Sequence, residues 1–451
     1  MEFSGTFARH FKNGSADGSN RADQYIRGLM QSRKKNMERM AEAVPDCDEQ
    51  QLQHFLSNSA WDERAVLDQV ALEADGLLGS SEDTALLIDE SGLTKKGQHS
   101  VGVARQWNGR LGKQDNCQVG VFAALSRGSL STLIDMRLFL PKGWVNDSKR
   151  CDVAGVPKEA RHKKTKPELA LEMVRYNREL GVRFGWVGAD GLYGNDPVFL
   201  RCLDDDGETF LADVHKAQRI YLEDPDPSVP PTSAGQRGRK RTKLVARSKA
   251  VRVDQWIEGQ PEKSWMKKTL RGSTKGKLRV ELLHRRVWVW DGKEARARCW
   301  HLVVRREIKR PLEIKFSLSN APEGTTPLRL AKIQAQRYWV ERSFQDGKSH
   351  VGLNDYQVRG WRGWHHHMAL VMMAMLFMLQ EKITNKEDIP LLSCADIETL
   401  LARFLPRRDV TADEVIRQME VRHSQRQASI DQAYSRQGLS QDLGPPLGVT
   451  K

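Results

Sequence analysis

Residues 84–89, TALLID, form a short apolar run that ends at an aspartate, and the fold is decided around them. A run of this length without helical spacing predicts a buried strand. Three similar runs follow closely: SVGVARQW from Ser100, CQVGVFAAL from Cys117 and STLIDMRLFL from Ser131. The sequence therefore predicts three or more neighbouring strands in this region.

Strands and helices alternate further along the chain. Helical spacing covers residues 166–180, RFGWVGA then runs into Asp190, a short helix is expected from Asp196, and the strand TFLADV begins at Thr209. Strands first, then strand and helix in alternation, are typical of a mixed α/β sheet flanked by helices. Continuous helical periodicity returns at residues 328–350 and again at residues 361–383.

Changes in composition divide the chain into five regions. The N-terminal stretch has helical spacing, whereas the Pro-rich segment DPDPSVPP and a basic run interrupt the α/β pattern before β-type texture resumes. Residues from His423 onward are rich in Gln, Ser and Gly, so a disordered tail is expected. We expect a helical N-terminal domain at 1–80, the first part of the core at 81–218, a β-rich insertion with a basic linker at 219–310, the second part of the core with a further helix at 311–405, and a C-terminal helix with a disordered tail at 406–451.

The charge balance favours a polyanionic partner. The 451 residues carry 72 Lys and Arg against 58 Asp and Glu, a formal net charge of +14. Nucleic acid is the leading partner on this ground, and an anionic membrane is second. The longest apolar run, residues 368–379, is shorter than the roughly 18–20 residues that span a bilayer. We therefore expect a buried helix there and no membrane partner.

Several other functional classes lack their sequence signals. The N-terminus shows no secretory signal, so we expect the protein to stay in the cytoplasm. The six cysteines include no C-x-x-C pair, which argues against a zinc site or a disulfide framework and predicts packed thiols. No phosphate-binding G-x-x-x-x-G-K-[ST] loop is present, so no nucleotide cofactor is expected.

Three acidic residues are the candidate metal ligands. Asp89 and Asp190 each end an apolar strand, and Glu341 lies in the helical segment RYWVERSFQDGK. Carboxylates at strand ends and on a crossing helix can converge on divalent cations such as Mg²⁺, which prefer oxygen ligands and support phosphoryl transfer. Helix capping or solvation are the common alternatives for such residues, and Asp135 and the acidic run at 204–206 are competing carboxylates.

Two cations share the helical face of Glu341. At about 100° per residue, Arg337 lies roughly 40° from Glu341 and Lys348 roughly 20° on the other side. The two side chains can hold phosphate oxygens near bound metal ions, or they can form structural ion pairs with the carboxylate.

These residues resemble the DDE transposases of bacterial insertion sequences, in the branch with a Y-(2)-R-(3)-E-(6)-K signature. Arg337, Glu341 and Lys348 match the signature, whereas Gln334 stands at the tyrosine position and Tyr338 lies one turn away. The resemblance extends over about residues 7–404 and includes three further segments: LLIDESGLTKKGQHSVGVARQWNGRLGKQDNCQVGV at 86–121, GADGLYG at 188–194 and GLNDYQVRGWRGWHHHMAL at 352–370.

The resemblance implies an RNase H-like mixed sheet with a β-rich insertion between the second aspartate and the glutamate. It implies that Asp89, Asp190 and Glu341 are catalytic and bind two Mg²⁺ ions, for which Mn²⁺ can substitute. Arg337 and Lys348 would hold phosphate, with Tyr338 as a further DNA contact. The expected activity is metal-dependent cleavage of the terminal inverted repeats of a mobile element and strand transfer into target DNA, by a homodimer in the bacterial cytoplasm.

Two other functions stay open from the sequence. One is a DNA-binding regulator on a transposase scaffold that no longer cuts, and the other is a stand-alone metal-dependent nuclease. Both would use DNA as the partner, so composition and motifs do not separate them.

The region between the second aspartate and the glutamate offers additional DNA-binding candidates. Arg239, Lys240 and Arg241 belong to a basic run that can track phosphates or form a solvated loop. Four tryptophans there can stack on an unpaired base, although a tryptophan in a strand is more often part of the core: Trp265, Trp288, Trp290 and Trp300. The basic segment 33–39 is either a solvated helix face or a DNA contact, and His365, His366 and His367 are expected to pack or face DNA rather than bind metal.

Overall fold

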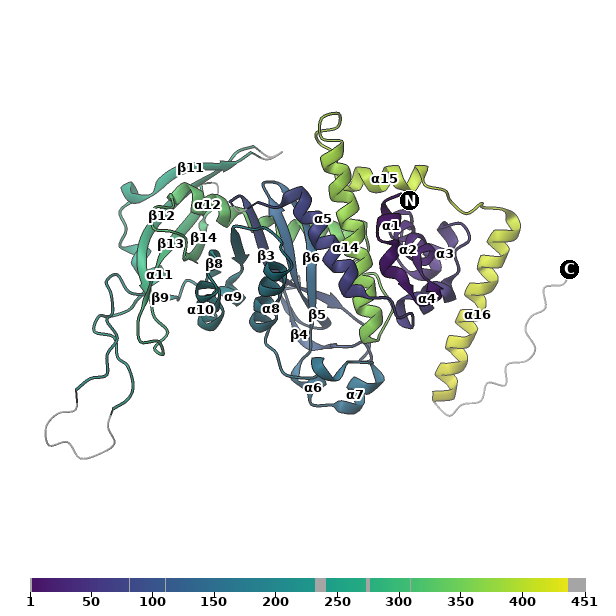
Figure 1. The fold of residues 1–451 in the computed structure, drawn as a ribbon, viewed down its shortest axis with the longest axis horizontal. Helices are drawn as coiled ribbons and strands as arrows, with labels where there is room; N and C mark the ends of the chain where they lie inside the picture. Colours follow the sequence, from purple (N-terminus) through teal and green to yellow (C-terminus); the bar gives the residue numbers. More distant parts are fainter. Residues whose placement is uncertain are drawn as a thin grey trace.

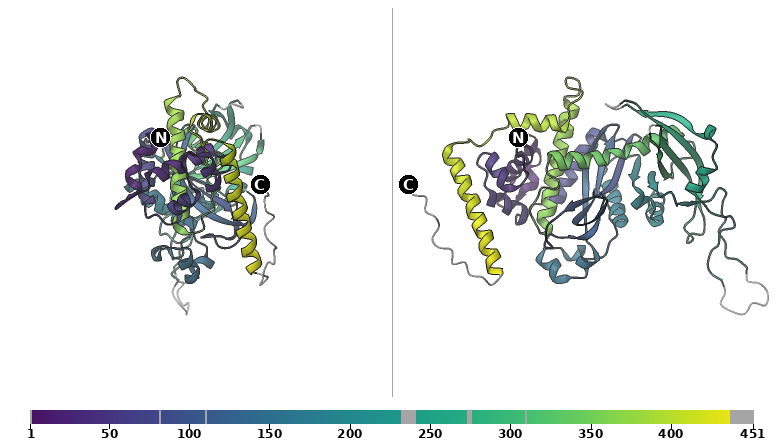
Figure 2. Two further views of the ribbon diagram at one scale, coloured as in Figure 1. Left: turned by 90° about the vertical axis from the view of Figure 1, so that its right-hand side faces the viewer. Right: turned by 180° about the vertical axis from the view of Figure 1, so that it is seen from behind.

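The computed structural model describes residues 2–80, 82–109, 111–231, 241–272, 276–308 and 310–436. One large sheet runs from the middle of an elongated molecule to one end, where the strands of the predicted β-rich insertion lie, and the N-terminal helices lie toward the other end beside the last helix, residues 412–436 (Figure 1). The two further views show the same arrangement from the side and from behind (Figure 2).

Ten strands form one mixed sheet. Across the sheet the order is β11 (Met266–Arg271), β12 (Leu278–Val289), β13 (Arg298–Glu307), β14 (Arg310–Ser319), β8 (Phe210–Val214), β7 (Trp186–Ala189), β3 (Thr84–Thr94), β5 (Lys113–Arg127) and β4 (Ala104–Asn108), with β6 (Leu130–Phe139) also paired to β5. The pairs β3–β7 and β7–β8 are parallel and all other pairs in this sheet are antiparallel. The predicted mixed α/β class is confirmed.

The strands of the insertion extend the central sheet. Strand β14 pairs antiparallel with β8, with Ser317 opposite Asp213, and β13, β12 and β11 follow on its far side. Backbone hydrogen bonds therefore run without a break from the insertion into the core. Two short pairs lie outside this sheet: β1 (Lys12–Asn13) with β2 (Ala16–Asp17), and β9 (Arg219–Ile220) with β10 (Val251–Arg252).

Helices flank the sheet and connect its strands. The first helices are α1 (Glu2–Thr6), α2 (Ser19–Gln31), α3 (Met37–Ala43), α4 (Glu49–Ser57) and α5 (Glu63–Leu78). Those between strands are α6 (Lys142–Val145), α7 (Ser148–Val153), α8 (Lys166–Glu179), α9 (Gly191–Gly194), α10 (Pro197–Asp205) and α11 (Val253–Glu258). The last are α12 (Pro327–Gln336), α13 (Tyr338–His350), α14 (Trp361–Thr384), α15 (Cys394–Phe404) and α16 (Ala412–Arg436).

Helix α14 is the buried helix that the apolar run predicted. Its side chains are almost all buried from Gly363 to Met375, and the helix contacts α2, α4, α5 and β6. His366 stacks on Trp61 with ring centroids 3.7 Å apart, and both lie in the core. All three histidines of this helix are buried, which agrees with a packing role. Among the described residues, no helix is long and apolar enough to cross a membrane.

The N-terminal helices form for the reasons that the sequence suggested. Helix α4 begins after Asp48, whose carboxylate accepts a hydrogen bond from the Gln51 amide at 2.9 Å, and it buries Leu52, Phe55 and Leu56. The predicted helix face at residues 33–39 is wrong in part, because α3 begins only at residue 37. Lys35, in the loop before it, is buried and pairs with Glu398 at 2.7 Å.

The C-terminal prediction needs a correction. Helix α16 continues to residue 436, beyond His423, where the composition predicted disorder. Polar contacts hold it: Arg422 reaches Glu42 of α3 at 2.8 Å, and Arg417 pairs with Glu414 at 2.7 Å. Residues 437–451 lie outside the described residues. All six cysteines are free, and four of them are buried, as expected for packed thiols.

The buried position of α14 predicts the cost of a cavity there. Replacing Leu370 by Ala should lower the free energy of unfolding by about 2–5 kcal/mol, because the lost methyl groups leave a void in a fully buried site. Urea denaturation measures this. The matched control Leu391→Ala, at a position that is 84% exposed, should change it by less than about 0.5 kcal/mol. Equal effects for the two variants would contradict a central role of α14.

Candidate active site

Asp89 and Asp190 lie side by side at the centre of the sheet. The parallel pair β3–β7 places Ile88 opposite Ala189, so the two aspartates occupy the next positions on neighbouring strands. Asp190 also caps α9, because its carboxylate accepts a hydrogen bond from the Leu192 amide at 2.8 Å. The strand ends that looked suggestive in sequence are therefore adjacent in space.

The surroundings of this pair make ionisation costly. Burial, followed by repulsion from Asp190, raises the pKa of Asp89 from an ordinary 3.8 to about 8, and Arg337 offsets only part of this effect. Burial and the charge of Glu90 raise the pKa of Asp190 as well. Neighbouring carboxyls with raised pKa values are common at functional sites, and a cation bound beside them would favour their ionised forms.

Arg337 links these acids to the helix. Its guanidinium donates to Asp213 at 3.0 Å through Nε and to Glu341 at 3.2 Å, and it lies 3.7 Å from Asp89. Although burial opposes the charge, these carboxylates raise the pKa of Arg337. One planar group thus touches three acids, which puts the carboxylates of Asp89 and Glu341 within about 1 nm of each other.

Glu341 and Lys348 follow Arg337 along α13. The Glu341 side chain is 54% exposed and turned toward Arg337. Lys348 donates to the hydroxyl of Ser91 at 2.6 Å, and Ser91 lies two residues after Asp89, on the same face of β3. The structure therefore brings both cations of the R-E-K spacing to the strand that carries Asp89.

Asp213 and the residues that position it were not among the predicted site residues. Asp213 is the next-to-last residue of the strand TFLADV and accepts a hydrogen bond from Ser317 of β14 at 2.6 Å. The Ser317 hydroxyl in turn accepts one from the amide of Gln334 at 2.7 Å. Gln334, which stands at the position of the signature tyrosine, is buried. Its side chain forms the far end of this series of hydrogen bonds. The sequence signal that could have pointed to Asp213 was an acidic residue near the end of a predicted strand.

Glu90 was also missed. Its carboxylate receives hydrogen bonds from Lys166 of α8 at 3.0 Å and from the Tyr193 hydroxyl of α9 at 3.0 Å. Being next to Asp89 in sequence, it adds negative charge close to Asp190, and this is the second cause of the raised pKa there.

The helical periodicity predicted for residues 328–350 is confirmed, as two helices that meet at Arg337, whose backbone stays in the helical region at φ −52° and ψ −29°. Helix α12 ends at Gln336 and α13 begins at Tyr338, with Arg337 between them. The junction coincides with the residue whose side chain reaches into the sheet toward Asp213 and Asp89.

The competing carboxylates have structural partners. Although burial opposes it, Arg137 and Arg64 hold the pKa of Asp135 below its ordinary value, and both pair with it at 2.6 and 2.7 Å respectively. Asp204 and Asp206 pair with Arg298 at 2.6 Å and Arg175 at 2.7 Å.

The remaining predicted DNA-binding residues have different surroundings. Arg239 and Lys240 fall outside the described residues, and Arg241 is exposed. Trp265 and Trp300 are buried, with Arg306 over the Trp265 ring and Phe210 edge-on to Trp300, whereas Trp288 and Trp290 are partly exposed. Tyr338 is 45% exposed and lies beneath the guanidinium of Arg271, 4.6 Å from its ring centroid.

The donor set can be tested for its fit to a divalent cation. In the part of the chain that the structure describes, no three His, Cys, Asp or Glu side chains are grouped closely enough to hold a metal ion. Asp89 and Asp190 nevertheless offer carboxylate oxygens, the ligands that hard cations prefer, and burial together with a neighbouring acidic charge raises the pKa of both. The aspartate pair therefore fits such an ion, with the exposed side chain of Glu341 nearby on α13.

Comparison with known proteins identifies the class. A family model described as DDE superfamily endonuclease matches residues 6–277, more than half of the chain, so the protein belongs to the DDE superfamily endonucleases. It is an enzyme of a phosphoryl-transfer class that uses divalent metal. The match includes Asp89 and Asp190 and ends before Glu341. The recognised DDE family is thereby confirmed.

At the level of individual proteins, the chain is similar to a probable transposase for insertion sequence element IS701 from Microchaete diplosiphon. The two are 24% identical over 334 residues, which cover 72% of this chain and 73% of that protein. The branch with the Y-(2)-R-(3)-E-(6)-K signature remains a prediction.

The raised pKa of Asp89 predicts a pH-dependent stability without metal. Between about pH 4 and pH 8 the folded protein keeps a proton that the unfolded chain has lost, so stability falls as pH rises through this window. Asp89→Asn cannot ionise. In EDTA, its stability advantage over wild type should grow from pH 4 to 8, by at most about 1.4 kcal/mol per pH unit, and then level off. Thermal unfolding measures this.

The exposed Asp388→Asn is the control, and its effect should stay small at every pH. A pH-independent difference between Asp89→Asn and wild type would show that Asp89 ionises normally in the folded protein.

The hydrogen bonds from Gln334 through Ser317 to Asp213 should contribute measurably to the free energy of unfolding. Ser317→Ala leaves the Gln334 amide and one Asp213 oxygen without their shared partner, and should lower the free energy of unfolding by about 1–3 kcal/mol. Chemical denaturation reports the change. Ser148→Ala, at an exposed site on α7, is the matched control and should cost less than about 0.5 kcal/mol. A cost for Ser317→Ala no larger than for the control would mean that these hydrogen bonds do not hold Asp213.

Proposed function

We propose that this protein is a DNA transposase. In this proposal it binds the terminal inverted repeats of its own insertion sequence, cleaves the strand at each end with Mg²⁺, and transfers the end into target DNA. Membership of the DDE superfamily endonucleases and the similarity to the transposase relative both support this function. In a bacterial cell the DNA, and therefore the enzyme, is in the cytoplasm.

The observation that carries the proposal is the buried aspartate pair. Asp89 and Asp190 are neighbours on parallel strands, both have raised pKa values, and Arg337 connects Asp89 to Glu341. A structural ion pair would need one cation per carboxylate and would not require two buried acids side by side. A site that gathers divalent cations explains this excess of negative charge.

The roles of the side chains follow from their contacts. Asp89, Asp190 and Glu341 are the oxygen ligands that would hold two Mg²⁺ ions, with Mn²⁺ as a substitute. When bound there, the ions supply activation of an attacking water or 3′-hydroxyl and charge stabilisation of the leaving oxygen. Arg337 stays anchored to Asp213 through Nε, while its other nitrogens exchange the Glu341 carboxylate for a phosphate oxygen.

Lys348 offers a second phosphate contact. It reaches the strand of Asp89 and donates there to the Ser91 hydroxyl, which a phosphate oxygen can replace as acceptor. Tyr338, Arg241, Trp288 and Trp290 are exposed or partly exposed and remain candidate DNA contacts.

The architecture supports the remaining parts of the proposal. The strand order β6-β5-β3-β7-β8, antiparallel and then parallel, agrees with an RNase H-like core. The helices before residue 80 form the part that would recognise the inverted repeats, and the net charge of +14 suits a DNA partner. Joining two ends calls for a homodimer in the synaptic complex.

One experiment separates this function from its rivals. The purified protein is incubated with labelled DNA that carries the inverted repeats flanking its own gene, first with Mg²⁺ and then with EDTA. Metal-dependent cleavage followed by joining to a target supports a transposase. Binding without cleavage favours the regulator, and cleavage without any joining favours a stand-alone nuclease.

The assigned ligands lead to a residue-level prediction. Asp89→Ala, Asp190→Ala and Glu341→Ala should each abolish strand cleavage, with rates at least about a thousandfold lower, because each removes a metal ligand. Gel-shift affinity for the element ends should stay within about threefold of wild type. Asp388→Ala is the control for loss of an exposed carboxylate and should cleave normally. Retained cleavage in any of the three would remove that residue from the site.

A further inference from the structure

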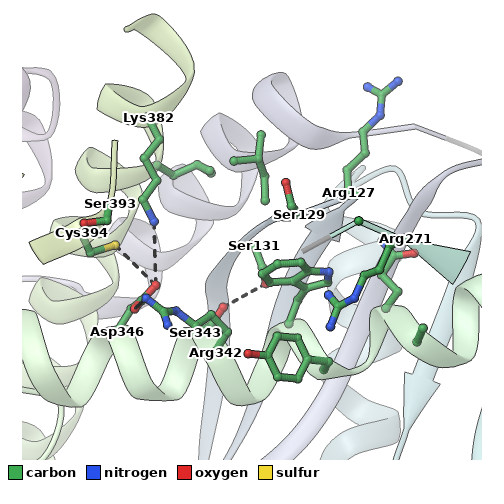
Figure 3. A pocket seen from close by; sticks show the side chains of 18 of the residues that line it. Arg127, Ser129, Ser131, Arg271, Arg342, Ser343, Asp346, Lys382, Ser393 and Cys394 are labelled. Atoms are coloured by element: carbon green, nitrogen blue, oxygen red, sulfur yellow. Dashed lines mark hydrogen bonds and ion pairs between the residues drawn. The ribbon is translucent and has the colours of Figure 1, made fainter. Parts of the chain in front are cut away.

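A cavity lies beside α13, the helix that carries Glu341. It has a volume of about 960 Å³ and is bounded by α12 and α13, the turn between β5 and β6, the end of β11, and the segments where α14 ends and α15 begins. Figure 3 shows Arg127 and Arg271 on one side of it and Lys382 on the other. The residues of α13 that line it include Tyr338, Trp339 and Arg342 but not Glu341, so this is a different face of the helix.

The cavity is strongly positive. Seven basic side chains line it against two acidic ones. Arg342 and Lys382 share the carboxylate of Asp346, at 3.0 and 3.8 Å, and Arg329 pairs with Asp83 at 2.7 Å. These ion pairs use both acidic groups, so the other basic side chains of the cavity have no acidic partner in its lining.

Four of the seven cations have no ion pair among the described residues: Arg271, which lies against aromatic rings, and Arg127, Lys332 and Lys386. Arg127 ends β5, Lys332 lies on α12 and Lys386 follows α14, and these three side chains are exposed. They reach the same cavity from three separate elements. Charges on a solvated surface usually point in different directions, whereas these three line one cavity. The cavity is therefore suited to a polyanion.

Aromatic rings line the same space. Tyr338 and Trp339 meet edge to face with centroids 5.2 Å apart, and the guanidinium of Arg271 lies over both rings, at 4.6 and 4.8 Å from their centroids. Tyr338 is largely exposed, and Trp339 is partly exposed. A cationic groove that includes aromatic rings and an arginine plane is the surface on which unpaired bases stack.

We propose that this cavity binds an unpaired stretch of DNA strand, with Arg127, Lys332 and Lys386 on its phosphates and Trp339 against a base. Its volume lies within the roughly 300–1,000 Å³ of sites that enclose small ligands, so it has room for nucleotides. The inference rests on the proposed function only in taking DNA as the substrate. Tyr338 and Arg342 lie three residues before and one residue after Glu341 in α13, so a strand held here would run along the same helix, on a different face from the catalytic carboxylate.

The test measures the affinity for a labelled oligothymidylate by fluorescence anisotropy over a series of salt concentrations. The full chain carries Asp89→Asn throughout, so that no cleavage interferes. Two triple variants remove the same charge at different places, namely Arg127→Gln with Lys332→Gln and Lys386→Gln in the cavity, and Lys142→Gln with Lys149→Gln and Lys158→Gln at exposed sites near α6 and α7.

We expect the cavity variant to bind oligothymidylate about tenfold or more weakly than its parent. The slope of log affinity against log salt should fall by about two, since each lost phosphate contact on a single strand accounts for roughly 0.7. The control variant should keep both affinity and slope. Equal losses in the two variants would overturn the inference, because they would reflect net charge alone.

A second readout tests the base contact independently of charge. Oligothymidylate should quench part of the tryptophan fluorescence, and Trp339→Phe, which keeps a ring and the fold, should remove that part of the quenching. Quenching unchanged by Trp339→Phe would exclude Trp339 as the stacking partner. Single charge variants, at exposed positions, replace the triple one if its unfolding midpoint falls.

Competition identifies the class of ligand. Unlabelled oligothymidylate should displace the probe, and polyglutamate of equal charge should not. Displacement by both would show a general acidic-polymer site and overturn the assignment to DNA. Failure of the transposase proposal would appear elsewhere, as a lack of metal-dependent cleavage of element ends by the wild-type protein.

Discussion

The cost of ionising two neighbouring carboxyls that are buried at the centre of the sheet is the constraint on which the rest of the site depends. Asp89 and Asp190 end up as neighbours because β3 and β7 are parallel and adjacent. Their charges are expensive in this setting, and Arg337 is the cation that partly offsets them. Every element that positions Arg337, and every cation that binds beside it, therefore affects the cost of ionising these carboxyls.

Arg337 connects this imbalance to the insertion. Its anchor Asp213 lies on β8, the strand to which β14 pairs, and Ser317 of β14 passes the hydrogen bonding on to Gln334 of α12. Because β14 pairs with β8, the strands of the predicted insertion extend the sheet that carries the candidate site, and Ser317 contacts Asp213 directly. The glutamine at the position of the signature tyrosine thus has a physical role in this chain, as a buried anchor.

Features that depend on residues close together in sequence were predicted, whereas features that depend on contacts between distant segments were missed. Apolar runs and caps act over a few residues, so strands β3, β5, β6, β7 and β8 and the cap at Asp48 were predictable. Asp213 and Glu90 matter only through partners from distant segments, such as Ser317 and Tyr193, and no local pattern shows those contacts. The helix beyond His423 is similarly held by Gln425, which donates a hydrogen bond to Glu49 of α4 at 2.8 Å, a contact that composition does not record.

The sequence by itself determined the mixed α/β class, the burial of α14 and the three acids worth considering, because hydrophobic periodicity and strand ends are local properties of the chain. Only the tertiary structure decided that Asp89 and Asp190 are neighbours, that Arg337 reaches Asp89 and Asp213 from the junction of α12 and α13, and that unpaired cations from three elements face one cavity. These features depend on which strands pair and which helices cross, and those choices are set by packing of the whole sheet rather than by any one segment.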